Sequence, residues 1–185
     1  MGTTSAPNVR RSAGAGAARR PRTAALAWAG AALTAALLLP VWPALRISDG
    51  GDTMGYLDLA EGEPLTISYV HSIDHLPIEE NLVVRDGRLV VDSTRLRQFG
   101  AGMGQIPGEG TGRADGEWWV VENMGRDIGT ELTIRVGAPA VDHRIRTPGA
   151  EVRLSPCLAA HRVHVRPVRL PTLLLPFSGV PAPEC

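Results

Sequence analysis

The sequence predicts an all-β protein, a single small antiparallel β-sandwich or partly open barrel that follows one N-terminal transmembrane helix. Two observations favour this class. An uncharged apolar stretch lies near the N-terminus, and the rest of the chain alternates short apolar segments with turn residues, without a sustained 3.6-residue period. The 185 residues are enough for one domain once the anchor is subtracted.

Residues 1–22 form the first predicted region, a disordered basic tail. The segment is rich in Gly, Ala and Ser and contains five arginines, while no acidic residue occurs before Asp49. Such a composition does not bury a core. Positive charge before an apolar stretch keeps that end in the cytoplasm.

Residues 23–45 form the predicted transmembrane signal-anchor. The 23 positions carry no charge, and a helix of that length crosses a bilayer core of roughly 30 Å. Trp28 and Trp42 lie towards the two ends, and Pro40 and Pro43 are expected to terminate the helix. A cleaved signal peptide is the competing interpretation, but a cut after Ala44 would place Trp42 at −3. We therefore expect a single-pass cell-membrane protein with an extracytoplasmic C-terminal domain.

Residues 46–170 are the predicted extracytoplasmic β domain. One half-buried strand is expected from Leu65 to His71, and Asp86-Gly87 predicts a hairpin turn between strands 78–84 and 89–95. That turn places Val84 opposite Leu89 and Leu82 opposite Val91. Further strands are expected at 117–122, 130–136, 142–146, 151–154 and 161–166. The apolar, Pro-rich tail 171–185 is expected to pack on the domain.

Charge and cysteine usage narrow the function classes. After residue 22 the chain has 14 basic and 19 acidic residues, a formal charge of −5, so a nucleic-acid partner is not expected. All nineteen basic residues are arginine. The two cysteines, Cys157 and Cys185, form no Cys-x-x-Cys motif. Outside the cytoplasm they can form a disulfide, and an unpaired thiol is the alternative.

One stretch carries a family resemblance. His71-Ser72, Asp74, Pro77 and Glu79-Glu80, followed by Gly100-Ala-Gly102, resemble the DUF1850 family of small bacterial and archaeal proteins of unassigned function. Asp74 stands where glutamate is typical. The resemblance covers roughly residues 55–170. It implies an association with TAXI-type tripartite (TRAP) transporters and no known reaction.

The candidate ligand-binding residues come from this stretch: His71, Ser72, Asp74, Glu79, Glu80, Gly100 and Gly102. His71 with the nearby carboxylates offers metal ligands, but a buried, hydrogen-bonded histidine is the favoured interpretation. Ser72 points away from His71 on a strand, so no catalytic triad is expected. Glu80 is expected to share a hairpin face with Arg95, and Glu79 to lie beside Thr94.

The glycine-rich segment 100–116 is expected to be a loop. It is either a mobile linker or, around Gly100–Gly104, a small anion-binding nest. No catalytic residue, metal or cofactor is predicted.

Three hypotheses remain for the function. The leading one is a non-enzymatic accessory or ligand-binding module of a TAXI-type TRAP transporter, at the outer face of the membrane. Its expected partners are the membrane and either the transporter subunits or a small carboxylate solute. The alternatives are a metal-dependent hydrolase or ligand-processing enzyme that uses His71 and the nearby carboxylates, and a structural protein of the envelope.

Overall fold

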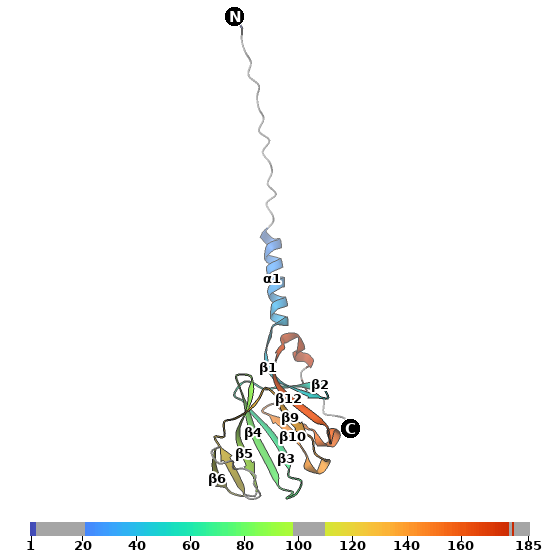
Figure 1. Ribbon diagram of the computed structural model, residues 1–185. Helices are drawn as coiled ribbons and strands as arrows, with labels where there is room; N and C mark the ends of the chain where they lie inside the picture. The colour runs from blue at the N-terminus through green and yellow to red at the C-terminus, as the bar shows by residue number, and fades with distance from the viewer. Residues whose placement is uncertain (3–20, 98–109, 178, 180–185) are drawn as a thin grey trace. The chain divides into compact units, whose positions relative to one another are not determined.

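A computed structural model describes residues 1–2, 21–97, 110–177 and 179 of the chain (Figure 1). The chain divides into two compact units, residues 1–36 and 37–185. Twelve strands lie in the described part, and every strand pairing is antiparallel. The all-β class is therefore confirmed.

The long helix α1 runs from Pro21 to Leu38. Among the described residues, none of the helices combines the length and the apolarity needed to span a bilayer. The helix predicted over 23–45 ends earlier than expected, because strand β1 begins at Pro40 and pairs with the C-terminal strand. Pro40 has no N–H for a helix, and Leu45 is fully buried in the core. The last residues of the predicted anchor therefore belong to the β domain.

The smaller sheet has the strand order β2-β1-β12-β9. Its strands are β1 (Pro40–Asp49), β2 (Asp52–Asp58), β9 (Leu132–Arg135) and β12 (Arg162–Pro171). Strand β1 lies in the middle, so the segment that follows α1 is an integral part of this sheet.

The larger sheet has the order β11-β10-β3-β4-β5-β7-β6, and β8 also pairs with β5. Its strands are β3 (Pro64–Val70), β4 (Pro77–Arg85), β5 (Arg88–Leu96), β6 (Thr111–Asp115), β7 (Trp118–Glu122), β8 (Arg126–Gly129), β10 (Arg144–Thr147) and β11 (Ala150–Arg153). Three short helices lie between or after the strands: η1 (Pro139–Val141), α2 (Ser155–Leu158) and η2 (Thr172–Phe177).

Both sheets bury side chains in one core. The smaller sheet contributes Leu45, Ile47 and Val163, and the larger contributes Leu65 and Ile145, all of them inaccessible to solvent. The period-two alternation of each strand directs one row of side chains inward. The other row of each strand points outward and is free to carry polar groups.

The β4–β5 hairpin has the predicted register at its turn and a different one at its open end. Val84 lies opposite Leu89 and Leu82 opposite Val91, as expected. A bulge between Asn81 and Leu82 then shifts the pairing by one residue. As a result Glu79 lies opposite Arg95 and Glu80 opposite Thr94, which corrects the predicted assignment of the two glutamates.

Four strands were not expected from the sequence: β1, β2, β6 and β8. Strand β6 lies within the predicted glycine loop and pairs with β7. Gly112 permits this pairing, since a Cβ at that position would lie 2.6 Å from the ring of Trp119. The residues of the loop from 100 to 109, including Gly100 and Gly102, lie outside the described part.

The described part of the C-terminal segment contacts strand β1. Strand β12 extends to Pro171, η2 follows, and the Thr172 hydroxyl accepts a hydrogen bond from the Trp42 indole N–H at 2.9 Å. Cys157 is disulfide-bonded. Cys185, the partner considered for it, lies outside the described residues, as do residues 3–20 of the basic tail.

Candidate functional site

The turn between β3 and β4 contains three of the predicted residues, His71, Ser72 and Asp74. His71 Nδ1 lies 3.2 Å from Asp74 Oδ2 and 3.4 Å from the Asp74 backbone N–H that donates to it. The backbone closes the turn, because His71 N–H donates to the Leu76 carbonyl at 2.9 Å. His71 is half-buried rather than sealed in the core, while Ser72 and Asp74 are exposed. The turn is therefore a self-contained local structure.

Glu79 and Glu80 leave strand β4 on opposite faces of the sheet. Glu80 shares the parity of the buried Ile78 and Leu82 and points to the core side. Glu79 points to the outer face, where Arg95 Nη1 lies 3.4 Å from its carboxylate. The Arg95 guanidinium also lies over the Trp118 ring, 4.8 Å from its centroid. The two glutamates therefore do not act on one ligand from the same side.

Glu80 lies among apolar and weakly polar neighbours on the core side. Its register partners are Ile67 and Thr94, both buried. Burial, with a smaller contribution from the Glu80 charge, raises the pKa of Tyr69. The Tyr69 ring stacks on the His143 ring with centroids 5.1 Å apart. This face is built mainly for packing.

On the outer face, the ends of β3 and β4 form a pocket with the segment leading into β10. Its volume is about 190 Å³. Its lining residues are Ser68, Tyr69, Val70, Pro77, Ile78, Glu79, Asp142, Arg144 and Arg146. Glu79 is the predicted residue that the structure brings to this pocket; Ser72 and Asp74 are not among the lining residues.

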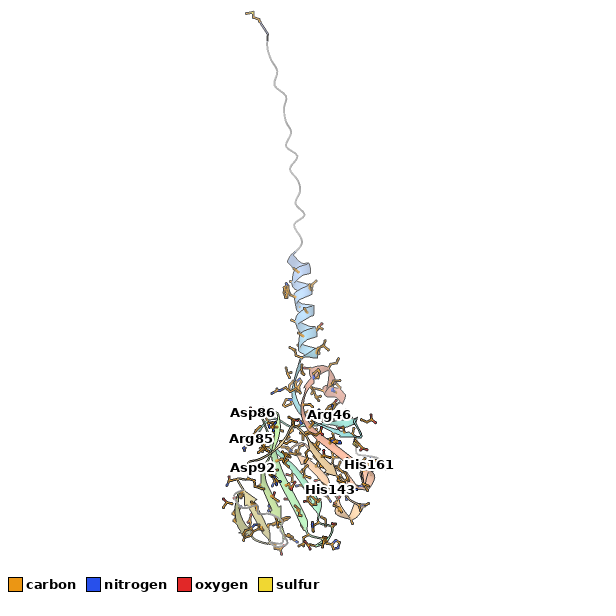
Figure 2. The ribbon with its side chains drawn as sticks, viewed as in Figure 1. Arg46, Arg85, Asp86, Asp92, His143 and His161 are labelled. Atoms are coloured by element: carbon orange, nitrogen blue, oxygen red, sulfur yellow. The ribbon has the colours of Figure 1, made fainter. Side chains whose placement is uncertain are left out.

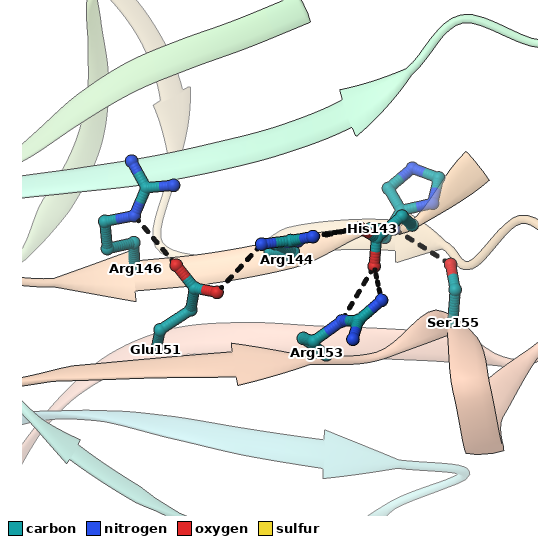
Figure 3. A network of polar contacts seen from close by, with 7 residues as sticks. His143, Arg144, Arg146, Glu151, Arg153 and Ser155 are labelled. Carbon is teal, nitrogen blue, oxygen red and sulfur yellow. Dashed lines mark hydrogen bonds and ion pairs between the residues drawn. The ribbon is translucent and has the colours of Figure 1, made fainter. Parts of the chain in front are cut away.

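The polar wall of the pocket belongs to a network of ion pairs on β10 and β11 (Figure 3). Asp142 accepts hydrogen bonds from Arg144 Nε at 2.9 Å and from Arg153 Nε at 2.9 Å. Glu151 accepts from Arg144 Nη1 at 3.1 Å and from Arg146 Nε at 3.0 Å. Each carboxylate thus bridges two guanidinium groups.

The local fold explains this arrangement. The β10–β11 hairpin places Arg144 opposite Arg153 and Arg146 opposite Glu151, with all of these side chains on the outer face. Asp142 adopts the left-handed conformation, with φ of 50°, just before β10. Aspartate tolerates this conformation better than most residues, and the carboxylate reaches both Arg144 and Arg153.

The arginines hold the carboxylates ionised. Hydrogen bonds from Arg144, and to a lesser degree from Arg153, lower the pKa of Asp142. Hydrogen bonding to Arg146 lowers the pKa of Glu151. The Asp142 contact in turn raises the pKa of Arg144. Asp142 and Glu151 are therefore ionised at neutral pH.

His143 lies between Asp142 and Arg144 in the chain and is held by two hydrogen bonds. Its Nδ1 accepts a hydrogen bond from the Gly137 N–H at 3.0 Å, and its own backbone N–H donates to the Ser155 hydroxyl at 2.9 Å. Burial lowers the pKa of His143, against a weaker opposing effect of Asp142. A neutral imidazole with an unprotonated Nδ1 is the form that this hydrogen bond requires.

The charged groups that line the pocket are equal in number. They are two guanidinium groups, those of Arg144 and Arg146, and two carboxylates, those of Glu79 and Asp142. Both guanidinium groups also contact Glu151, which lies outside the lining. An arginine-lined pocket of this kind suits a planar anion such as a carboxylate.

The same residues offer little to a metal ion. Within the described ranges, no group of three or more His, Cys, Asp or Glu side chains is close enough to hold one. His71 and Asp74 make a pair, and Glu79 and Glu80 diverge from it on opposite faces.

The network residues were not among the candidates from the sequence. The strands 142–146 and 151–154 were expected, and their alternating charges on either side of Pro148-Gly149 were the available signal. The local sequence does not indicate that β10 pairs with β3. This pairing places Arg144 opposite Ser68, and Ser68 in turn lies opposite Glu79.

Residues 65–154 match the model of a family described as a domain of unknown function, DUF1850. The chain carries a DUF1850 domain. The match begins in β3 and ends just after β11, so it includes the β3–β4 turn, both glutamates and the ion-pair network. Comparison with the curated proteins and with the solved structures gave no match.

Proposed function

We propose that this DUF1850 protein is a membrane-anchored, extracytoplasmic accessory of a TAXI-type TRAP transporter and binds a small carboxylate solute. The observation that carries the solute proposal is the pair of guanidinium groups, those of Arg144 and Arg146, that lines the outer-face pocket. Guanidinium groups bind carboxylates through paired, charge-assisted hydrogen bonds.

Two observations support the extracytoplasmic location. The segment 23–45 has no charged residue and follows a cluster of five arginines. Cys157 is disulfide-bonded, and disulfides persist mainly outside the reducing cytoplasm. The transporter itself is suggested by the family resemblance.

We further infer that the scaffold is a two-sheet sandwich and not a closed barrel. In the described part, the smaller sheet ends at β2 and β9, and the larger ends at β11 and β6, without pairing between the two sheets. A rigid sheet face holds the arginines of β10 and β11 in fixed positions, as a binding site needs.

The solute proposal is tested by thermal unfolding of the full chain in detergent, with a panel of mono- and dicarboxylates of two to six carbons. A bound solute raises the midpoint, by the equivalent of about 2.7 kcal/mol at 100 times its Kd. Arg144→Gln should abolish the shift and Arg146→Gln should reduce it. Arg88→Gln is the matched control, because Arg88 forms an exposed ion pair with Asp127 away from the pocket.

Two results would contradict the solute proposal: a panel without any stabilising member, or an equal shift in Arg144→Gln and the unmodified chain. The partner proposal has a separate test. Mild detergent extraction should recover TRAP membrane or binding subunits with the tagged chain, and their genes should lie nearby. If neither subunit is recovered and the neighbouring genes do not encode them, the partner proposal would be contradicted.

A metal-dependent hydrolase is the second candidate. The close His71–Asp74 pair is the observation in its favour. If metal binds there, addition of Zn²⁺ should stabilise the unmodified chain more than a His71→Ala variant. Equal midpoints with and without Zn²⁺ would count against it.

A further inference from the structure

Exposed large apolar side chains collect at one end of the β domain. In the described part of residues 37–185 they are Leu37, Leu38, Leu39, Val41 and Trp42 in the first segment, Leu173 and Leu174 in η2, and Ile73 in the β3–β4 turn. All except Ile73 fall in two segments. We call Leu38, Leu39, Val41, Trp42, Leu173 and Leu174 the apolar end patch.

The pairing of β1 with β12 brings the two halves of this patch together. Pro40 lies opposite Pro171 and Trp42 opposite Leu170, so the start of one strand meets the end of the other (Figure 1). The hydrogen bond from Trp42 to Thr172 fixes η2 beside β1. Leu39 and Leu173 are each more than half exposed, at 55% and 54%. Exposed apolar clusters of this kind mark interaction surfaces.

We propose that the apolar end patch inserts into the surface of the lipid bilayer, at the boundary between headgroups and acyl chains. The inference rests on the membrane anchor of the proposed function. The uncharged stretch that begins at residue 23 continues into the patch without a charged residue before Arg46. A domain attached to the anchor with no polar linker has this end at the bilayer.

The chemistry at the edge of the patch fits a lipid surface. Trp42 combines an apolar ring with a polar N–H, and such rings favour the interfacial zone. Arg169 is exposed and donates to the Val41 carbonyl at 3.4 Å. None of the ion pairs found among the described residues includes Arg169, so its guanidinium is available to a lipid phosphate.

Acidic residues limit the depth of insertion. A pocket of about 590 Å³ beside Trp42 is lined by Pro43, Leu59 and Leu175 and, on its rim, by the exposed Asp58 and Glu63. Carboxylates remain in water. The contact therefore ends at Trp42, and the remainder of β1 stays in the domain core.

The test uses the full chain in phosphatidylcholine nanodiscs that contain lipids brominated near the headgroup end of the acyl chain. The chain has four tryptophans. In a Trp28→Phe background, Trp42 is the one at the patch, and Trp118 and Trp119 lie on β7. We expect the brominated lipids to quench the tryptophan fluorescence of this variant strongly. The Trp28→Phe/Trp42→Phe variant should lose that quenching.

Matched variants locate the contact. Leu173→Ser/Leu174→Ser in the Trp28→Phe background should reduce the quenching of Trp42, whereas Ile73→Ser, an exposed apolar residue outside the patch, should leave it unchanged. If the double serine variant does not fold, the loss on Trp42→Phe still decides the test. The far-ultraviolet circular dichroism of each variant reports its folding.

The outcomes separate the anchor from the patch. Quenching of Trp28 in a Trp42→Phe chain, without quenching of Trp42 in the Trp28→Phe chain, would overturn the patch contact while leaving the anchor. If neither Trp28 nor Trp42 is quenched, both the membrane anchor and the contact of the patch with the bilayer would be overturned. Protection of Trp42 by self-association, detected as a dimer by light scattering, would also overturn the proposal in favour of a second copy.

Discussion

One end of the β domain displays Arg144, Arg146 and Glu79 around a small polar pocket, and the other displays Leu39, Trp42 and Leu173 to solvent. Strand β4 separates them. It starts at Pro77 beside the polar pocket, and the turn that follows it, Asp86-Gly87, lines a pocket with Pro43 and Ala44. Nine residues of strand span roughly 25–30 Å.

The labelled side chains show the same separation, with Asp86 towards the start of β1 and His143 further along the domain (Figure 2). The formal net charge of zero therefore does not describe how polar and apolar side chains are distributed, because the polar pocket and the exposed apolar residues lie at different ends of the domain. In the proposed arrangement, the apolar end meets the bilayer and the arginine-rich pocket faces the aqueous compartment. A solute would then reach the pocket without crossing the lipid surface.

The largest expected effect tests where the apolar end stops. Leu45 is fully buried, although the sequence assigns it to the membrane segment, whereas Leu39 is exposed. Leu45→Ala should lower the free energy of unfolding by about 2–5 kcal/mol. Leu39→Ala should stay within about 0.5 kcal/mol of the unmodified chain. Urea unfolding of the detergent-solubilised chain measures both changes. Equal changes would contradict the assignment of Leu45, and not Leu39, to the core of the β domain.

A smaller effect is expected at the polar end. Asp142→Asn removes the anion that Arg144 and Arg153 share, and should cost about 1 kcal/mol of stability at pH 7. Since the arginines lower the pKa of Asp142, its contribution is present above the unfolded pKa of about 3.9 and is lost as pH falls through the lower folded value. The difference between variant and unmodified chain should therefore shrink below pH 4, in the same urea assay.

His143 should give the polar end a pH dependence that the apolar end lacks. Its folded pKa is lowered by burial, so the unfolded chain binds the proton more readily. The contribution of the neutral His143 to the stability should be fully present above the unfolded pKa of about 6.5. It should decrease as the pH falls below that value. His143→Gln should flatten the stability profile between pH 7.5 and 5.5. An unchanged slope would assign the effect to another histidine.

The smallest effect is expected in the β3–β4 turn. Ser72 is exposed and is not a lining residue of the pocket. Ser72→Ala should change the free energy of unfolding by less than about 0.5 kcal/mol and leave carboxylate binding intact. Loss of binding in this variant, with normal stability, would transfer the site from the arginine network to the turn.

The sequence predicted the hairpin and most strands because alternation and turn residues are local signals. Strand β1 was missed because its apolar residues continue an apolar helix, and only pairing with β12 distinguishes the two. The exchange of Glu79 and Glu80 was missed because a bulge between Asn81 and Leu82 has no strong local signature.

The candidate site was only partly predictable, for the same reason. Glu79 was recognised, yet its neighbours Arg144 and Arg146 come from a strand some 65 positions away in the chain that reaches the site by pairing with β3. Residue identity suggests which groups bind an anion; sheet order decides which of them meet.

The central claim is that the arginines of the outer-face pocket bind a small carboxylate, and an NMR titration of the arginine Nε–H groups tests it most directly. The full chain, labelled with ¹⁵N in detergent, would be titrated with the most stabilising carboxylate of the panel. The account predicts saturable shifts of Arg144 and Arg146, with Arg88 and Arg113 unmoved. Shifts of equal size at all four, or none at Arg144 and Arg146, would contradict it.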